Sequence, residues 1–298
     1  MKQFSTGLVP SPIDSRDILT SQITPIIKRI PKEFPPPFDL EVLNQNHYPA
    51  CVGFSCATLK QEKELRERVV ETFDGKWIYD QCKKIDGIPN FKGTYLRAGM
   101  KTLLNKGAKP LGKPETEASK YRIGGYARVD DLSFEGIKKA IAVHGALLAG
   151  MRGDNAGWQT VYIKPPQTPE WGHAISIIAY TEKYLIFQNS WGKDWGKNGI
   201  GYIPANYLPF EAWVSLVDRP NTAPEAPVSG LEGWVASKYV RPVLRAGNSV
   251  YPYVRLNIRE TPAGKRITTL NRGDELKIIS SDIKITNGYK WIKVRKNV

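Results

Sequence analysis

The chain has 298 residues, of which 41% are hydrophobic and 24% are charged. This length is enough for two domains, because a single domain usually has about 100–200 residues. No apolar run approaches the ~18 residues of a transmembrane helix, so the sequence predicts a globular protein without a membrane span. The three cysteines are too few for a disulfide framework.

The beginning of the chain bears on its location. Met1–Pro10 lacks the apolar segment of a secretory signal peptide. We therefore expect synthesis in the cytoplasm. The final location stays open, and release from the cell by a leaderless route is one alternative.

The formal net charge of +14 is unevenly spread. Residues 233–298 hold fourteen Lys and Arg against four Asp and Glu, a net charge of +10. The other 232 residues hold a net charge of only +4. This basic excess bears on the partners of the C-terminal part rather than on its fold.

Residues 1–37 form a Pro-rich lead that we expect to be extended. Pro31, Pro35, Pro36 and Pro37 lie close together at its end. The lead is either an arm that wraps the protein or a short peptide that is removed. The simpler interpretation is an arm bound at the surface, without a regulatory role.

Cys51 stands at the start of a predicted helix. Pro49 is tolerated in the first turn of a helix but cannot continue one from upstream. The residues from Cys51 to Val69 then form a helical pattern whose first half is apolar enough to be buried. The start of a helix and a nearby imidazolium both lower the pKa of a thiol. Cys51 is therefore a candidate nucleophile.

The later elements divide into a helical part and a strand-rich part. The helical pattern continues to about Lys106, with a helix over Tyr95–Lys106. From Tyr126 onward the pattern predicts strands, apart from a helix over Phe134–Val143. The expected strands are Gly145–Met151, Ala174–Tyr180, Tyr184–Phe187, Gly199–Pro204 and Ala212–Leu216.

Two polar residues flank a predicted hairpin. His173 begins one strand and Asn189 follows the next, so the hairpin brings them side by side. A histidine can take the thiol proton and return it to the leaving amine. Asn189 can hold one ring nitrogen of His173 so that the other faces the sulfur.

The order of these residues resembles the papain family of cysteine proteases, in its prokaryotic form. His173 and Asn189 follow Cys51 by 122 and 138 residues, against about 130–150 in that family. Gln45 precedes the cysteine by six residues, and Asn189–Gly196 has the family's Asn-Ser-Trp-Gly-x-x-Trp-Gly motif. The resemblance implies an α+β, two-lobed fold, with Cys51 on a helical lobe and His173 on a β-barrel-like lobe.

The resemblance also implies roles for further residues. Gln45 and the backbone N–H of Cys51 would stabilise the oxyanion. Trp191 would shield the bond between Asn189 and His173, with Trp195 packed beside it. Three small residues would line the substrate site: Gly93 through its backbone, and Ala149 and Ala174 as the floor of a side-chain pocket.

The chain departs from the family pattern near the cysteine. Tyr48 stands where the family commonly has a cysteine, so the disulfide of that cysteine cannot form. Val52 replaces a tryptophan, and Gly172 precedes the histidine where papain has an aspartate. The change at Gly172 can alter the pH profile but removes no catalytic role.

The end of the chain resembles a second, smaller module. Residues 219–232 are a linker by composition, after a peptidase domain at 38–218. Val254–Lys265, Leu270–Leu276 and Gly288–Val294 resemble bacterial SH3-like domains, but the usual last strand is missing. Gly233–Val240 has the character of that strand. We therefore expect residues 233–298 to form a permuted β-barrel, with Gly233–Val240 beside Tyr289–Arg295.

These observations predict a cysteine endopeptidase that acts on protein or peptide substrates, without a metal or cofactor. One alternative is an amide hydrolase for peptidoglycan stem peptides, since SH3-like modules often bind cell walls. Another is an inactive papain fold that only binds. The basic module would bind a cell-wall polymer or an acidic protein face, or would be a solvated surface without a partner. No recognised nucleic-acid motif accompanies its charge.

Overall fold

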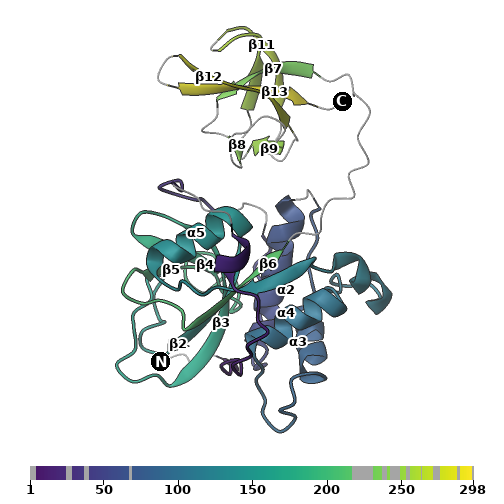
Figure 1. The fold of residues 1–298 in the computed structure, drawn as a ribbon, viewed down its shortest axis with the longest axis vertical. Helices are drawn as coiled ribbons and strands as arrows, with labels where there is room; N and C mark the ends of the chain where they lie inside the picture. The colour runs from purple at the N-terminus through teal and green to yellow at the C-terminus, as the bar shows by residue number, and fades with distance from the viewer. Residues whose placement is uncertain are drawn as a thin grey trace. The chain divides into compact units, whose positions relative to one another are not determined.

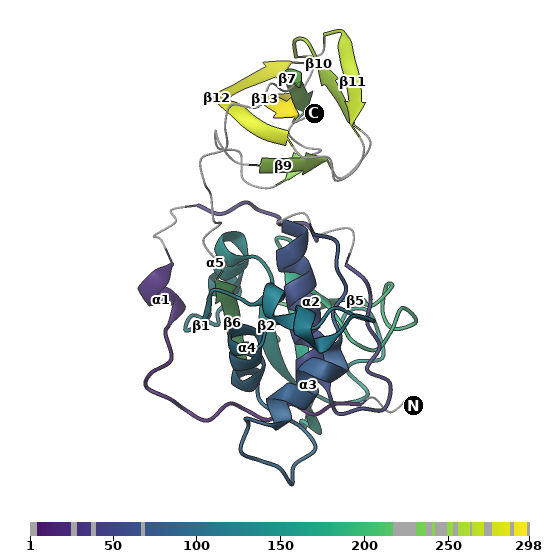
Figure 2. The ribbon, with the colours of Figure 1, turned by 90° about the vertical axis from the view of Figure 1, so that its right-hand side faces the viewer.

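The structure is a computed structural model that divides into two units, Met1–Pro220 and Asn221–Val298 (Figures 1 and 2). The described residues are 5–24, 29–36, 40–66, 69–216, 231–236, 240–241, 249–252, 256–262, 264–270, 276–286 and 289–296. The predicted linker lies largely outside the described residues.

The first unit has a helical half of three main helices. These are α2 (Cys51–Arg66), α3 (Gly75–Lys83) and α4 (Leu96–Asn105). The side chain of Asp74 caps α3 by accepting a hydrogen bond from the Trp77 N–H at 3.0 Å. The expected helix over Tyr95–Lys106 is α4, while α2 is described to Arg66 rather than Val69. Two short helices, α1 (Thr20–Ile23) and the 3₁₀ helix η1 (Glu115–Tyr121), accompany them.

The other half of the first unit is a six-stranded sheet in which every neighbouring pair is antiparallel. The helix α5 (Phe134–His144) packs on it. In spatial order the strands are β1 (Gly125–Arg128), β6 (Glu211–Leu216), β2 (Leu147–Gly153), β3 (Trp171–Tyr180), β4 (Tyr184–Gln188) and β5 (Ile200–Pro204). The predicted helix and strands are thus present, with bounds that shift by one to three residues.

The two faces of the sheet bury different side chains. Side chains alternate between the faces of a strand. Ala174 of β3 therefore packs in a cluster with the helical half, whereas Ile175 packs in a second cluster on the other face. The Ser176 hydroxyl donates to the Ser55 carbonyl at 2.7 Å and ties β3 to α2. This contact sets β3 against the N-terminal half of α2.

The described residues of the second unit form seven strands in one antiparallel sheet. In spatial order they are β11 (Arg266–Leu270), β10 (Leu256–Arg259), β7 (Leu231–Ala236), β13 (Tyr289–Lys296), β12 (Leu276–Thr286), β9 (Ser249–Pro252) and β8 (Val240–Arg241). The expected pairing of β7 with β13 is confirmed, with Val235 opposite Ile292. Residues 237–239 of the predicted strand lie outside the described residues.

Within the described part of the chain, no helix is long and apolar enough to cross a membrane.

Candidate active site

Cys51 is the first residue of α2 and is fully buried. Burial raises the pKa of its thiol to about 11, although backbone hydrogen bonds from Ala174, Val52 and Gly7 act in the opposite direction. Two of these neighbours come from outside α2. The sulfur therefore lies between the helical half, the strand β3 and the N-terminal lead.

His173 and Asn189 meet at the base of the predicted hairpin. His173 lies on β3, Asn189 follows β4, and His173 Nε2 and Asn189 Oδ1 are 2.8 Å apart. The Ser190 N–H also donates to Asn189 Oδ1 at 2.8 Å, which identifies that atom as the acceptor. His173 Nε2 is therefore the donor. Nδ1 is the nitrogen left to accept a proton, and it has no hydrogen-bond partner among the described residues.

Aromatic rings enclose the imidazole. Trp191 stacks on His173 with ring centroids 4.4 Å apart and an interplanar angle of 24°. Trp195 packs against Trp191 edge to face at 5.5 Å. Trp158, which the sequence analysis missed, is fully buried and meets His173 edge to face at 5.6 Å. These rings exclude water, and burial lowers the pKa of His173 to about 4 despite its bond to Asn189.

The Gln45 side chain is oriented by Ser190, a residue to which the sequence analysis gave no role. Its side-chain oxygen accepts a hydrogen bond from the Ser190 hydroxyl at 2.6 Å. Its side-chain nitrogen donates to the carbonyl of Tyr48 at 2.8 Å and to that of Ser5 at 3.1 Å. The amide is thus oriented, and one of its N–H groups points at a carbonyl of the N-terminal lead.

The first described part of the lead, residues 5–24, is called the N-terminal arm below. It runs between the two halves of the unit (Figure 1, purple). The Leu8 N–H donates to the Gly172 carbonyl of β3 at 3.1 Å. On the other side, the Thr94 N–H donates to the Gly7 carbonyl at 2.9 Å, and the Val9 N–H donates to the Thr94 carbonyl at 3.0 Å. The arm therefore covers the site and does not merely lie on the surface.

The Leu8 side chain is only 6% exposed and belongs to the same apolar cluster as Ala174. Gly150 lies beside it, because a Cβ added to Gly150 would lie 2.7 Å from Leu8 Cδ2. Phe210 packs against this cluster. Ala149 does not join the group. It packs in the cluster on the opposite face of the sheet, since consecutive side chains of β2 alternate.

The backbone contacts also differ from the expectation by one residue. Gly93 was expected to pair with the main chain of a substrate, but both hydrogen bonds to the arm come from Thr94. Gly93 instead permits the close approach. A Cβ there would lie 2.0 Å from the Gly7 carbonyl oxygen.

No group of three or more His, Cys, Asp or Glu side chains suited to a metal ion occurs among the residues that the structure describes.

Comparisons with known proteins bear on this first unit. Residues 94–207 match the sequence model of the papain family cysteine proteases. The structure is similar to that of xylellain, a cysteine protease from Xylella fastidiosa, with 24% identity and a TM-score of 0.63 over 72% of this chain and 97% of that one. No curated protein sequence matches the chain significantly.

Two more distant structures have the same fold. Procathepsin B from Trypanosoma congolense matches with 15% identity and a TM-score of 0.56, over 72% of this chain and 86% of that one. A cysteine protease from Carica candamarcensis, in complex with E-64, matches with 16% identity and a TM-score of 0.52, over 64% of this chain and all of that one.

The first unit thus has the fold of a papain-like cysteine peptidase, a hydrolase. Residues 94–207, which match the sequence model of the papain family, lie within this unit.

Proposed function

We propose that the chain is a cysteine endopeptidase that hydrolyses peptide bonds through Cys51, His173 and Asn189. The observation that carries the proposal is the 2.8 Å bond between His173 Nε2 and Asn189 Oδ1. It leaves Nδ1 to act as the base for Cys51, which lies at the start of α2 and receives a backbone hydrogen bond from Ala174, the residue after His173. No other described cysteine begins a helix.

In the covered state both groups are neutral, because burial raises the pKa of the thiol and lowers that of the imidazole. Displacement of the arm by a substrate admits water and removes part of this effect. The start of α2 and the ion pair with His173 then favour the thiolate. Cys51 is therefore activated when the arm leaves.

The reaction forms a thioester. Cys51 Sγ attacks the scissile carbonyl carbon while its proton goes to His173 Nδ1. His173 returns that proton to the leaving nitrogen as the C–N bond breaks. Water then attacks the thioester, again deprotonated by His173, and releases the carboxylic acid and the thiol.

The oxyanion is stabilised by Gln45 and the backbone N–H of Cys51. The Gln45 N–H that bonds the Ser5 carbonyl in the covered state becomes free when the arm leaves. Ser190 keeps the amide in the required orientation. A donor that is already oriented stabilises the developing negative charge without reorganisation.

The arm indicates the side chain that the site prefers. Leu8 is buried next to Gly150 and Ala174, so we propose that a leucine-sized apolar side chain of the substrate takes the same place. Ala174 keeps the role expected of it in this pocket, and Gly150 replaces Ala149.

Hydrolysis of casein and of purified peptidoglycan by the full chain tests the proposal, with and without an epoxide inhibitor of cysteine proteases. We expect inhibitor-sensitive cleavage of casein that is absent in a Cys51→Ala variant. Release of peptidoglycan fragments without casein cleavage would favour the amide hydrolase. If neither substrate reacts, even with Leu8→Ala to weaken the arm, the fold is a binding scaffold.

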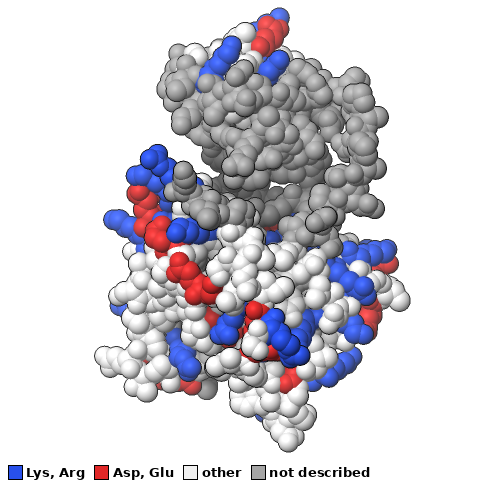
Figure 3. All heavy atoms as spheres, viewed as in Figure 1, with Lys and Arg blue, Asp and Glu red and all other residues white. Residues whose placement is uncertain are grey.

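We propose that the second unit is a permuted SH3-like barrel that binds an anionic partner, such as a cell-wall polymer. The pairing of β7 with β13 supports the order of strands. The charge of the unit supports an anionic partner, since residues 233–298 have a net charge of +10. On the first unit, by contrast, acidic and basic side chains are interspersed over the described surface in view (Figure 3).

Two measurements test this second unit. Deletion of residues 231–241 should unfold or aggregate it while peptidase activity survives, because the edge of β13 would lose its partner. Binding of the full chain to cell-wall sacculi should weaken as salt rises from low to physiological concentration. A folded, monomeric deletion variant would refute the permuted barrel, and equal binding at both salt concentrations would refute the charge-based partner.

A further inference from the structure

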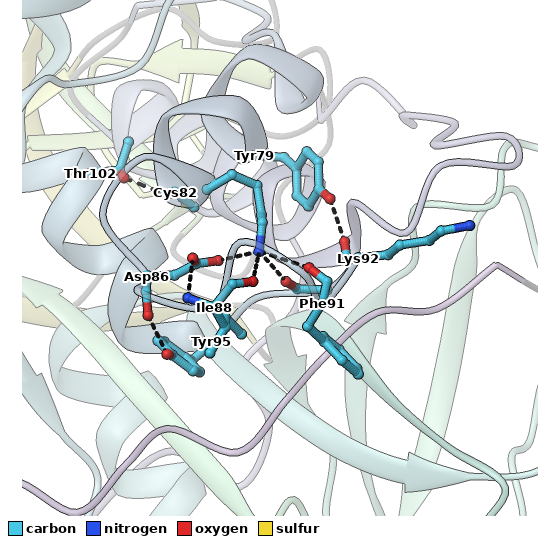
Figure 4. Close-up of polar contacts among 10 residues, drawn as sticks. Tyr79, Cys82, Asp86, Ile88, Phe91, Lys92, Tyr95 and Thr102 are labelled. Carbon is cyan, nitrogen blue, oxygen red and sulfur yellow. Dashed lines mark hydrogen bonds and ion pairs between the residues drawn. The ribbon is translucent and has the colours of Figure 1, made fainter.

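One lysine at the end of α3 is surrounded by oxygen atoms. Lys83 Nζ lies 2.7 Å from Asp86 Oδ2, and 3.0, 2.8 and 3.0 Å from the carbonyl oxygens of Ile88, Phe91 and Gly93 (Figure 4). An ammonium has three N–H donors, so four acceptors use all of them. The Lys83 side chain is 18% exposed and that of Asp86 is fully buried. This set of contacts is built into the fold and is not a solvated surface charge.

The loop from Asp86 to Gly93 is organised around this ammonium. Asp86 Oδ1 accepts a hydrogen bond from the Ile88 N–H at 3.0 Å. Two tyrosine hydroxyls outside the loop hold two more of its carbonyls. The Tyr95 hydroxyl donates to the Asp86 carbonyl, and the Tyr79 hydroxyl donates to the Lys92 carbonyl (Figure 4). The chain's three cysteines are free, so no disulfide ties the loop. Noncovalent contacts alone hold it.

The contact between Lys83 and the Gly93 carbonyl acts directly on the site. The Gly93 carbonyl and the Thr94 N–H belong to the same peptide group, and in a trans peptide they point in opposite directions. Lys83 binds the oxygen side at 3.0 Å. The hydrogen side donates to the Gly7 carbonyl of the arm at 2.9 Å. Fixing the carbonyl therefore aims the N–H at the path of the arm, and a cation on the oxygen strengthens the N–H as a donor.

We propose that Lys83 is a positioning residue for the substrate main chain. Its ammonium orients the Gly93–Thr94 peptide group so that the Thr94 N–H binds a substrate carbonyl, as it binds Gly7 of the arm. The role toward the substrate rests on the proposed peptidase function, whereas the role toward the arm does not. Lys83 touches no reacting atom and acts through Thr94.

The test compares Lys83→Met with Lys109→Met, which is a matched control. The Lys109 side chain is 19% exposed and pairs at 2.7 Å with Asp74, the residue that caps the other end of α3. Both changes are made in a Leu8→Ala background, in which the arm competes less with the substrate. There, loss of one aligned hydrogen bond to the substrate should raise KM about threefold to tenfold and leave kcat nearly unchanged, since the bond is made equally in ground and transition states. Lys109→Met should leave KM unchanged.

A second readout separates positioning from general stability. In the same Leu8→Ala background, a peptide substrate truncated so that it does not reach Thr94 should show the same KM with and without Lys83→Met. An equal rise in KM for long and truncated substrates would overturn the proposal. Lys83→Arg, which keeps the charge, should restore part of the lost affinity for the long substrate.

A third readout does not need hydrolysis. The arm uses the same Thr94 N–H, so Lys83→Met should also loosen the arm and speed alkylation of Cys51 by iodoacetamide, about threefold to tenfold. Lys109→Met should not. If neither the parent chain nor Leu8→Ala cleaves a peptide, the proposed function fails, and the alkylation rate still tests the role of Lys83. Unchanged alkylation in Lys83→Met would overturn the positioning role.

Discussion

Replacement of Leu8 by alanine should uncover the site. Leu8 is 6% exposed and packs in the apolar cluster that contains Ala174. The change removes three carbon atoms, each worth about 0.8 kcal/mol when buried. Allowing for partial relaxation, the covered state loses about 2 kcal/mol, which shifts the opening equilibrium about 30-fold, since 1.4 kcal/mol is a factor of ten.

Alkylation of Cys51 in the full chain measures this equilibrium. The thiol is fully buried and its pKa is about 11 in the covered state, so it reacts only after the arm moves. The rate at fixed pH is then the opening equilibrium multiplied by the rate of the open state. With iodoacetamide and peptide mapping, we expect Leu8→Ala to label Cys51 about 30-fold faster than the parent chain.

The arm supplies its own control. Ile13 is 93% exposed on the same arm, so Ile13→Ala should change the rate less than twofold. Cys56 and Cys82 are buried in the apolar cluster of the helical half, and their labelling should stay slow in both variants. Equal labelling of Cys51 in Leu8→Ala and Ile13→Ala would refute the reasoning, as would parallel acceleration at all three cysteines.

Three further predictions concern catalysis and pH. Gln45→Ala should lower kcat by roughly 10²–10³ without a change in Tm, the usual loss for one oxyanion donor, and an unchanged kcat would exclude that role. Asn189→Ala should cost less activity than Cys51→Ala, because His173 remains as the base; equal losses would contradict the orienting role. Burial and the charge of Lys63 lower the pKa of His144 to about 4, so the folded state binds fewer protons there than the unfolded state between about pH 6.5 and 4, and stability falls as pH falls through that range. His144→Gln should therefore reduce the pH dependence of the unfolding free energy in urea, and an unchanged slope would argue against this contribution.

The sequence predicts that His173 and Asn189 meet, as they do in the structure, because the types and order of these residues carry the signal. A thiol, an imidazole and an amide have few other reasons to occur at these spacings beside a helix start and a hairpin. The position of His173 near Asn189 follows from the pairing of two adjacent strands, which apolar runs reveal. Ser190 and Trp158 were missed because a serine and a tryptophan fit many surroundings, and only the tertiary contacts distinguish these two.

The residues proposed to face the substrate were harder to place because each depends on register. One residue along a strand moves a side chain to the opposite face, which separates Ala149 from Gly150. A shift of one residue also makes Thr94, rather than Gly93, the backbone partner of the arm. Leu8 lies in a Pro-rich stretch without any periodicity, so its burial depends wholly on the groups it meets. Lys83 looks like a solvated charge beside Lys84, because three of its four partners are backbone carbonyls that no residue type encodes.

The shared peptide group links the arm to the substrate. If arm and substrate both use the Thr94 N–H, Lys83→Met weakens both, and its effect on activity in the full chain is the difference between two losses. Leu8→Ala weakens only the arm, so it should raise activity at low substrate concentration. In the double variant the arm is already displaced, and the remaining effect of Lys83→Met is then the loss of substrate binding alone. The KM of Leu8→Ala/Lys83→Met relative to Leu8→Ala is therefore the cleanest measure of what the ammonium contributes to the substrate, and a ratio near one would leave Lys83 with a role for the arm only.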